Sequence, residues 1–316
     1  MLKTAICDLF GIEHPIIQGG MAWLGTAELV SAVSNAGGLG IIGAGNARPD
    51  WVRQQIHLTR QRTNKPFGVN IMLLSPYVKQ VIEIVLAERV AVVTTGAGNP
   101  EAYIPQLKQA GIKVMPLVGS VASAKRMEQA GVDAIVAEGT EAGGEVGETT
   151  TMVLVPQVVD SVQIPVVAAG GIGDGRGLAA ALALGAQGVQ MGTRFICSDE
   201  CIAHPRFKEE ILKAGERSTV VTGQSIGSAT RRLRNRLTQQ FLELENAGAT
   251  KEELDLLGRG RTRLGLIEGD VAEGSLLAGQ IAGLIKEIKP VRIIIEEMVT
   301  EAEAIIKTAE KRISCG

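Results

Sequence analysis

The chain has 316 residues, a net charge of −2 and 45% hydrophobic residues. This length and composition allow one large buried core without a division into several domains. The near-neutral charge favours neither nucleic acid nor a membrane surface as a partner of the whole chain. Aromatic residues make up only 3% of the sequence, which leaves few platforms for stacking nucleic-acid bases. We therefore expect no nucleic-acid partner and no membrane association.

Eight short apolar runs recur along the first 192 residues at intervals of roughly 20 to 30 residues. They cover residues 15–18, 39–42, 67–72, 90–95, 113–118, 134–138, 165–169 and 188–192. Helical patterns lie between them, for example over residues 27–36, 49–61, 77–88, 122–130 and 152–161. Eight strand–helix units predict an α/β fold, a (β/α)8 TIM barrel with its active site at the carboxyl ends of the strands. A doubly wound sheet is the alternative, but no GxGxxG motif opens the first helix.

The pattern changes after the eighth run. Residues 198–271 show no clear strand, and residues 206–263 carry 12 Lys and Arg against 8 Asp and Glu. We predict a mostly helical inserted subdomain here that binds substrate as a lid, with the barrel formed by residues 1–197 and 272–316. Small and apolar residues predict a helix over 274–284, and an amphipathic pattern predicts a helix over 291–311 that closes the barrel.

The four cysteines contain no CxxC pair, and the chain has only three histidines. We therefore expect no metal site and free thiols in a reducing cytoplasm at Cys7, Cys197, Cys201 and Cys315. The first residues include Lys3 and Asp8 and lack an apolar stretch, so we expect no signal peptide. A long uncharged run, residues 177–193, is interrupted by glycines, so we expect no membrane span.

Glycines end the seventh and eighth predicted strands, at Gly170–Gly171 and at Gly192 beside Thr193. Unpaired backbone N–H groups at two neighbouring strand ends predict a phosphate site, which a TIM barrel commonly places there. Other strand ends carry Gly19, Gly20, Met21, Asn70 and Glu138. Asn70 could equally cap a turn and Met21 could fill a core, but together these ends suit a flat heteroaromatic ring with a phosphate tail. This combination favours FMN over a dinucleotide.

Many motifs of one family occur in order along nearly the whole chain. They include HPIIQGGMAW, AGGLGIIGAGN, KPFGVNIMLLSP, VVTTGAGNP, AEGTEAGG, PVVAAGGI, QMGTRF and GDVAEGSLLAGQIAGLI. On these motifs the chain resembles the FMN-dependent enoyl-[acyl-carrier-protein] reductase II group, whose close relatives are the nitronate monooxygenases. The resemblance implies FMN, NADH or NADPH as reductant, and an enoyl thioester on acyl carrier protein as substrate. We further expect a cytoplasmic homodimer, and a requirement for a monovalent cation stays open.

The resemblance also implies which residues contact FMN. They are Gly19, Gly20, Met21, Asn70, Glu138, Gly143, Gly144, Gly170, Gly171, Gln190, Gly192 and Thr193. Within this set the two pairs Gly170–Gly171 and Gly192–Thr193 would hold the phosphate, in agreement with the strand-end argument.

Two positions depart from the family pattern. A histidine usually follows EAGG, but this chain has Glu145, and a second family histidine is replaced by Ser228. In the monooxygenases the first histidine is the catalytic base, so its loss argues against nitronate oxidation. We predict catalytic roles for Glu145 and for Gln280 in the C-terminal motif. A nitronate monooxygenase-like oxidase and a catalytically impaired flavin-binding homologue remain the alternatives.

A general acid at position 145 would need a raised pKa. Glu138, Glu141, Glu145 and Glu148 share one short segment, and repulsion among them is expected to raise some of their pKa values. The alternative interpretation is a solvated acidic loop without a role in catalysis.

The insertion contains two arginine clusters. Arg231, Arg232, Arg234 and Arg236 form the first, and Arg259, Arg261 and Arg263 form the second. A basic surface beside the barrel mouth would attract a strongly acidic acyl carrier protein. The alternative is a solvated basic helix face. We predict that the first cluster binds the carrier protein.

Overall fold

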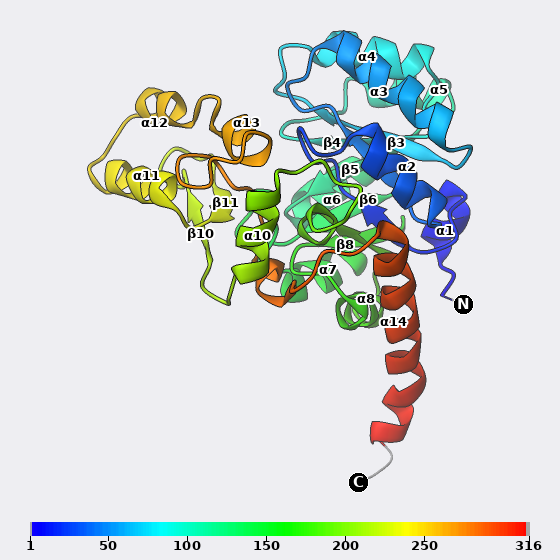
Figure 1. Ribbon diagram of the computed structural model, residues 1–316. Helices are drawn as coiled ribbons and strands as arrows, with labels where there is room; N and C mark the ends of the chain where they lie inside the picture. The colour runs from blue at the N-terminus through cyan, green and yellow to red at the C-terminus, as the bar shows by residue number, and fades with distance from the viewer. Residues whose placement is uncertain (1, 314–316) are drawn as a thin grey trace.

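The computed structural model describes residues 2–313. Eight parallel strands lie in the order β1-β9-β8-β6-β5-β4-β3-β2, and a bridge between Ile17 and Leu39 joins the first and last of them (Figure 1). The strands are β1 (Ile16–Gln18), β2 (Gly40–Gly43), β3 (Phe67–Met72), β4 (Val92–Gly96), β5 (Lys113–Val118), β6 (Ile135–Glu138), β8 (Val166–Ala169) and β9 (Gly188–Met191). This arrangement confirms the predicted TIM barrel and excludes the doubly wound sheet.

The apolar runs form strands because both of their faces are buried. Val136 and Val167 point into one cluster that fills the barrel, whereas Val166 and Ala168 belong to the larger cluster beneath the surrounding helices. The short helix α1 (Ala5–Phe10) packs on the inner cluster at the amino ends of the strands. The interior is therefore closed at this end, and the opposite end is left to carry the site.

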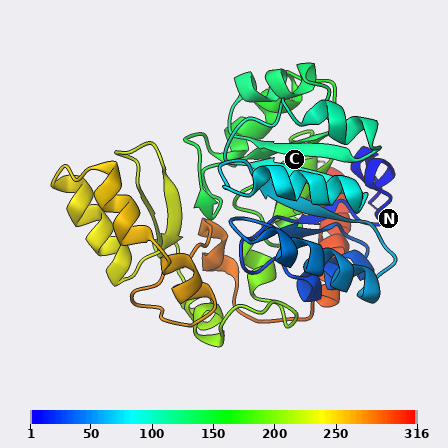
Figure 2. The ribbon, with the colours of Figure 1, turned by 90° about the horizontal axis from the view of Figure 1, so that it is seen from above.

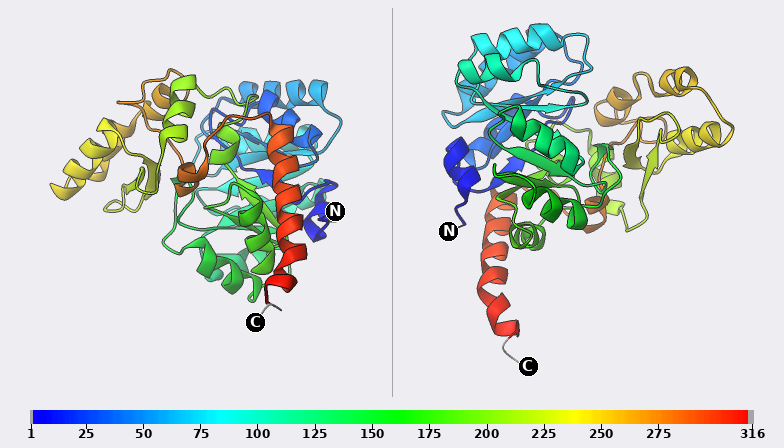
Figure 3. Two further views of the ribbon diagram at one scale, coloured as in Figure 1. Left: turned by 60° about the horizontal axis from the view of Figure 1, so that its bottom comes forward. Right: turned by 180° about the vertical axis from the view of Figure 1, so that it is seen from behind.

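The barrel helices follow their strands in sequence. They are α2 (Ala27–Asn35), α3 (Pro49–Arg62), α4 (Val78–Ala87), α5 (Ile104–Gln109), α6 (Val121–Gln129), α7 (Thr151–Val159), α8 (Gly175–Ala183) and α14 (Val291–Ile313). The long helix α14 packs against α8 and α2 along the side of the barrel (Figure 3), which confirms the predicted closing helix. Among the residues described, no helix combines the length and apolarity needed to cross a bilayer.

The insertion projects to one side of the barrel mouth (Figure 2). After the short helix α9 (Thr193–Ile196), it contains α10 (Pro205–Lys213), α11 (Arg236–Asn246), α12 (Lys251–Gly258) and α13 (Arg261–Leu266). The expectation of no strand is wrong, because β10 (Thr219–Thr222) and β11 (Thr230–Leu233) form an antiparallel hairpin. Their sequences, TVVT and TRRL, lack an apolar run and so give little signal of a strand.

The predicted helix over 274–284 is also mostly wrong. Residues 274–279 form no helix, and only a 3₁₀ helix, η1 (Gln280–Leu284), follows. The glycines of this segment are needed for close backbone packing. A Cβ at Gly274 would lie 2.2 Å from the Cα of Gly265, and a Cβ at Gly279 would lie 2.6 Å from the carbonyl oxygen of Glu141. The extended segment thus runs tightly between lid and barrel.

Candidate active site

A cavity of about 700 Å³ opens at the carboxyl ends of the barrel strands, beneath the insertion. All twelve residues predicted to contact FMN line it, together with Glu145 and Ser228. The twelve come from segments far apart in sequence because they lie in or just after five different parallel strands, β1, β3, β6, β8 and β9. The structure therefore brings the predicted cofactor residues together in one place.

Two amides are positioned at the bottom of this cavity. Asn70 of β3 donates from Nδ2 to Oγ1 of Thr94 at 3.0 Å, which leaves its Oδ1 without a protein donor. The buried Oε1 of Gln190 in β9 has no hydrogen-bond partner in the chain. A buried polar atom without a partner is costly, so these amides are suited to a polar ligand edge such as that of a flavin ring.

The glycines at the strand ends fit the predicted phosphate site. Gly170 and Gly171 have φ values of +93° and +71°, which side chains disfavour. Gly192 is different: its φ is −111°, and an added Cβ would meet only the sulfur of Met21 at 3.5 Å, an ordinary contact. Neither backbone nor protein packing requires glycine at 192, whereas a ligand that approaches the backbone would.

Thr193 follows Gly192 and is tied to the C-terminal part of the chain. Its buried Oγ1 accepts a hydrogen bond of 2.9 Å from the backbone N–H of Gly279. The extended segment after the lid is thereby joined to the strand end that would hold the phosphate. The hydroxyl hydrogen of Thr193 remains free to donate to an anion.

Glu138 ends β6 and lines the cavity. Burial, and secondly the nearby carboxylate of Glu145, raises the pKa of Glu138 to about 8. The carboxyl is thus largely protonated at neutral pH and can donate a hydrogen bond or a proton. Repulsion within the acidic segment was the expected cause of such a shift, but burial is the larger one.

Glu141, from the same segment, has a structural task. Its carboxylate accepts from the backbone N–H of Thr151 at 2.9 and 3.0 Å and from the Thr151 hydroxyl at 2.9 Å. These bonds satisfy an otherwise unpaired donor at the start of α7. Glu148 is exposed and is absent from the cavity lining, so the four carboxylates do not act as one group.

The two positions that depart from the family pattern lie on neighbouring segments. Glu145 belongs to β7 (Gly144–Glu145), which pairs antiparallel with β11 of the insertion, opposite Thr230. Val146 donates to the carbonyl of Ala229 at 3.0 Å. Glu145 and Ser228 consequently face the same cavity from the barrel and from the lid. No histidine is among the described residues that line it.

Gln280 does not reach this cavity. Its side chain is exposed at the start of η1, and its backbone N–H donates to the carbonyl of Glu141 at 2.9 Å. It is missing from the cavity lining, unlike its neighbours Gly279 and Ile281. The structure therefore gives the predicted catalytic role of Gln280 no support in this arrangement.

The first arginine cluster lies on strand β11 and the start of α11, so the interpretation as one basic helix face is wrong. Arg231 is buried and donates to the carbonyl of Thr140 at 2.9 Å. The Arg232 guanidinium packs 4.5 Å from the centre of the Phe241 ring, and burial lowers its pKa to about 10. Only Arg234 and Arg236 are exposed.

No local pattern in the sequence identifies the lid residues that line the cavity. Ile226, Lys251, Leu266 and Leu277 come from four different segments of or beside the insertion. Only the start of α12 carries a recognisable signal, since Thr250 and Glu253 form a capping box. That signal places a helix start at Lys251 but cannot show that this residue faces the barrel mouth.

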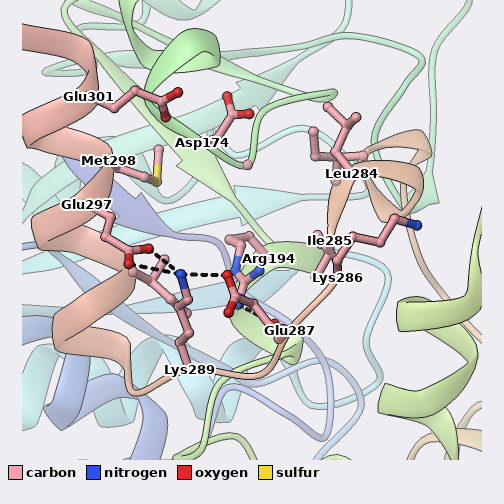
Figure 4. Close-up of a pocket in the computed structure, with 13 residues that line it drawn as sticks. Asp174, Arg194, Leu284, Ile285, Lys286, Glu287, Lys289, Glu297, Met298 and Glu301 are labelled. Atoms are coloured by element: carbon pink, nitrogen blue, oxygen red, sulfur yellow. Dashed lines mark hydrogen bonds and ion pairs between the residues drawn. The ribbon is translucent and has the colours of Figure 1, made fainter. Parts of the chain in front are cut away.

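A second, smaller cavity of about 170 Å³ lies between η1, α14 and the start of α8 (Figure 4). Lys289 pairs there with Glu287 at 2.6 Å and Glu297 at 2.7 Å. Nη2 of the buried Arg194 donates to the carbonyls of Cys197 and Glu287, each at 2.9 Å. These contacts hold the segment before α14 against the strand end that carries Thr193.

Comparison with known proteins identifies the family of this chain. The model of the nitronate monooxygenase family matches residues 3–81 and 75–301. The chain belongs to this family. Its members and the FabK proteins are FMN enzymes, and the chain is accordingly a flavin-dependent oxidoreductase.

Three proteins with different names are similar to this chain. The solved structure of FabK from Thermotoga maritima is 50% identical, covers 99% of this chain and all of its own, and gives a TM-score of 0.97. A (3aS,4S,5R,7aS)-5-hydroxy-7a-methyl-1-oxo-octahydro-1H-indene-4-carboxyl-CoA dehydrogenase from Mycobacterium tuberculosis is 34% identical, with 98% of each chain covered. A probable nitronate monooxygenase from Staphylococcus saprophyticus is 39% identical over 78% of this chain and 82% of its own.

Proposed function

We propose that the protein is an FMN-dependent enoyl-thioester reductase that uses NADH or NADPH and acts on enoyl groups carried by acyl carrier protein. The observation that carries the proposal is the cavity itself, which combines glycine-rich strand ends with carboxyl groups and contains no histidine among its described residues. The likeness to FabK, an enoyl-acyl-carrier-protein reductase II, supports it.

The residues present fit FMN. Gly170, Gly171, Gly192 and Thr193 would hold the phosphate, while Asn70 and Gln190 would meet the polar edge of the ring. Bound FMN would supply a redox-active ring that accepts hydride from a reduced nicotinamide and delivers it to an activated double bond.

Glu138 and Glu145 line the cavity with carboxyl groups that could supply a proton. Glu138 retains its proton at neutral pH. Glu145 stands at the rim on a strand fixed by β11, so its position is set by the backbone. Protonation of the substrate α-carbon needs a donor beside the reacting atoms, and we assign this role to Glu145, with Glu138 as its protonated neighbour.

The proposal also covers the carrier of the substrate, the cellular compartment and the oligomeric state. The exposed pair Arg234 and Arg236 would attract an acidic carrier protein to the mouth of the cavity. The Mycobacterium tuberculosis relative, named for a carboxyl-CoA substrate, supports recognition of a thioester. We further propose a cytoplasmic homodimer.

An anaerobic experiment tests the activity. NADH or NADPH is expected to bleach the flavin of the purified protein, and crotonyl thioester is expected to restore its yellow colour with formation of butyryl thioester. A flavin that is bleached but recoloured only by oxygen would contradict an enoyl reductase. A flavin that neither nucleotide bleaches would favour an impaired, flavin-binding homologue.

A nitronate monooxygenase is the second candidate, favoured by the 39% identical staphylococcal relative. The cavity argues against it, since Glu145 and Ser228 occupy the two positions where the resemblance expects histidine. Oxygen consumption with an alkyl nitronate, measured beside crotonyl thioester reduction, separates the two activities.

A further inference from the structure

Lys251 is a cation of the lid at the mouth of the large cavity. It is the first residue of α12 in the lid and lines the large cavity of the barrel mouth. Among the described residues that line this cavity, it is the only one with a cationic side chain. Its side chain is exposed and takes part in no hydrogen bond or ion pair within the described chain.

None of the three acids on α12 pairs with Lys251: Glu252 and Asp255 form no hydrogen bond or ion pair with it in the described chain, and Glu253 is engaged at the helix start. Glu253 accepts from the backbone N–H of Thr250 at 2.8 Å and is held in the capping box. Across the cavity, Glu141 caps α7. The ammonium group therefore has no partner in the protein that would neutralise it, and its charge is available to a ligand.

The ligands of the proposed reaction are anionic, and the cavity is otherwise acidic. Glu138, Glu141 and Glu145 all line it. A reduced nicotinamide dinucleotide carries a pyrophosphate, and a thioester carried on coenzyme A or on a carrier protein has a phosphate at the base of its pantetheine arm. Either phosphate would be repelled by the carboxylate of Glu141, which lines the cavity, and attracted by the unpaired ammonium group of Lys251.

On this geometry we infer that Lys251 binds a ligand phosphate at the mouth of the cavity and so positions the ligand that enters it. The inference rests on the proposed function, because that function supplies the phosphate-bearing ligands. The chemistry recognised is one phosphate group, whether it comes from the dinucleotide or from the pantetheine arm. Lys251 is thus a positioning residue, since it stands on the lid and away from the strand ends that would hold FMN.

Steady-state kinetics of the holoenzyme with paired probes test the inference. Lys251→Ala should raise KM for a phosphate-bearing partner by about 5- to 20-fold with kcat changed less than about twofold, as for one partly exposed charge-assisted hydrogen bond. Lys251→Arg should retain most of the affinity. The matched control is Arg259→Ala, which removes an exposed cation at the other end of α12 that has no partner in the described chain.

Phosphate-free probes identify the source of the phosphate. If NADPH is affected but 1-benzyl-1,4-dihydronicotinamide is not, the phosphate belongs to the dinucleotide. If crotonyl-CoA is affected but crotonyl-N-acetylcysteamine is not, it belongs to the thioester carrier. Equal losses with and without phosphate, losses equal to those of Arg259→Ala, or no loss at all would overturn the inference.

A binding measurement separates the inference from the proposed function. Calorimetric titration of the holoenzyme with coenzyme A and with 2′-phospho-ADP-ribose needs no turnover. At least one of them should bind the wild type about 5- to 20-fold more tightly than Lys251→Ala. If Lys251→Ala weakens this binding but the wild-type protein reduces no enoyl thioester, the phosphate site at Lys251 is supported and the reductase function is rejected. Unchanged binding in an active reductase would reject the lysine site alone.

Discussion

Glu145 is the residue at which this chain departs most clearly from its family pattern, and the fold fixes where it stands. Its strand pairs with β11, and its side chain lines the cavity beside Glu138. A carboxyl group can replace an imidazole as proton donor only if it holds a proton near neutral pH. The nearby Glu138 has a raised pKa and holds a proton at neutral pH within the same cavity.

Glu145→Gln should leave reduction of the flavin by NADH or NADPH nearly unchanged and slow the transfer to enoyl thioester by roughly 10- to 100-fold. The reason is that only the second half-reaction requires a proton at the α-carbon. Glu145→His should retain or raise turnover. Stopped-flow absorbance of the two half-reactions provides the measurement, and two silent substitutions would show that solvent provides the proton.

The raised pKa of Glu138 predicts that the stability of the folded protein depends on pH. The folded protein holds its proton up to a pH of about 8, whereas the unfolded carboxyl loses it near 4.5. The folded state therefore binds more protons between these values, and the free energy of unfolding should fall as pH rises through this window. Thermal unfolding should show a smaller decline for Glu138→Gln than for wild type, and parallel curves would contradict the raised pKa.

At the scale of elements, the hairpin of β10 and β11 connects the lid to the barrel. Strand β11 pairs with β7, and Arg231 donates to Thr140 in the same loop of the barrel. The arginines of this hairpin differ in burial, since Arg232 packs against the Phe241 ring. Arg231 turns inward, while Arg234, just beyond β11, remains exposed. Only the exposed members can meet a protein partner.

Reversing the exposed charges should affect carrier-protein substrates selectively. The double substitution Arg234→Glu and Arg236→Glu should raise KM for enoyl-acyl-carrier protein several-fold and leave crotonyl-CoA nearly unchanged, because rim charges mainly alter association. The difference should shrink at high salt. Lys79→Glu with Lys125→Glu, two exposed lysines on barrel helices, is the control. Equal losses on both substrates would assign Arg234 and Arg236 a structural role.

At the scale of the whole molecule, the site exists because eight strand ends meet at one rim and the returning segment after the lid packs onto it. Gly279 donates to Thr193, and Gly143 lies so close to Ala278 that an added Cβ would be 2.6 Å from its carbonyl carbon. The barrel, the lid and the C-terminal segment therefore all form walls of the cavity. Binding of one FMN per chain should depend on all three.

Gly192→Val should abolish FMN retention while the protein stays folded. The protein itself leaves room at this position, since only Met21 lies within 4 Å of an added Cβ, so the added side chain would extend toward the phosphate. Flavin absorbance per chain and far-ultraviolet circular dichroism give the two readouts. Gly215→Ala, whose added Cβ meets no atom within 4 Å, should keep its flavin. Normal flavin content in Gly192→Val, or FAD in the wild type, would refute the predicted phosphate site.

The strands, and the strand-end residues that line the cavity, could be predicted from the sequence for a physical reason. A buried parallel strand must be apolar on both faces, so 67–72 and 165–169 are visible as short runs between glycines. Because strands in a barrel end at one rim, residues such as Asn70 and Gly170 could be assigned to one site without knowing their distances.

Only the tertiary structure shows which residues of the lid line the cavity. The polar strands of the hairpin gain their stability from pairing with each other and with β7, a contact that no local pattern encodes. The same pairing buries Arg231, places Ser228 beside Glu145 and brings Lys251 to the cavity. The segment around Gln280 was misjudged because its glycines serve close packing against the barrel, which small residues in a sequence cannot distinguish from a helix face. Local sequence determined the barrel, and long-range packing determined which residues of the insertion can meet a ligand.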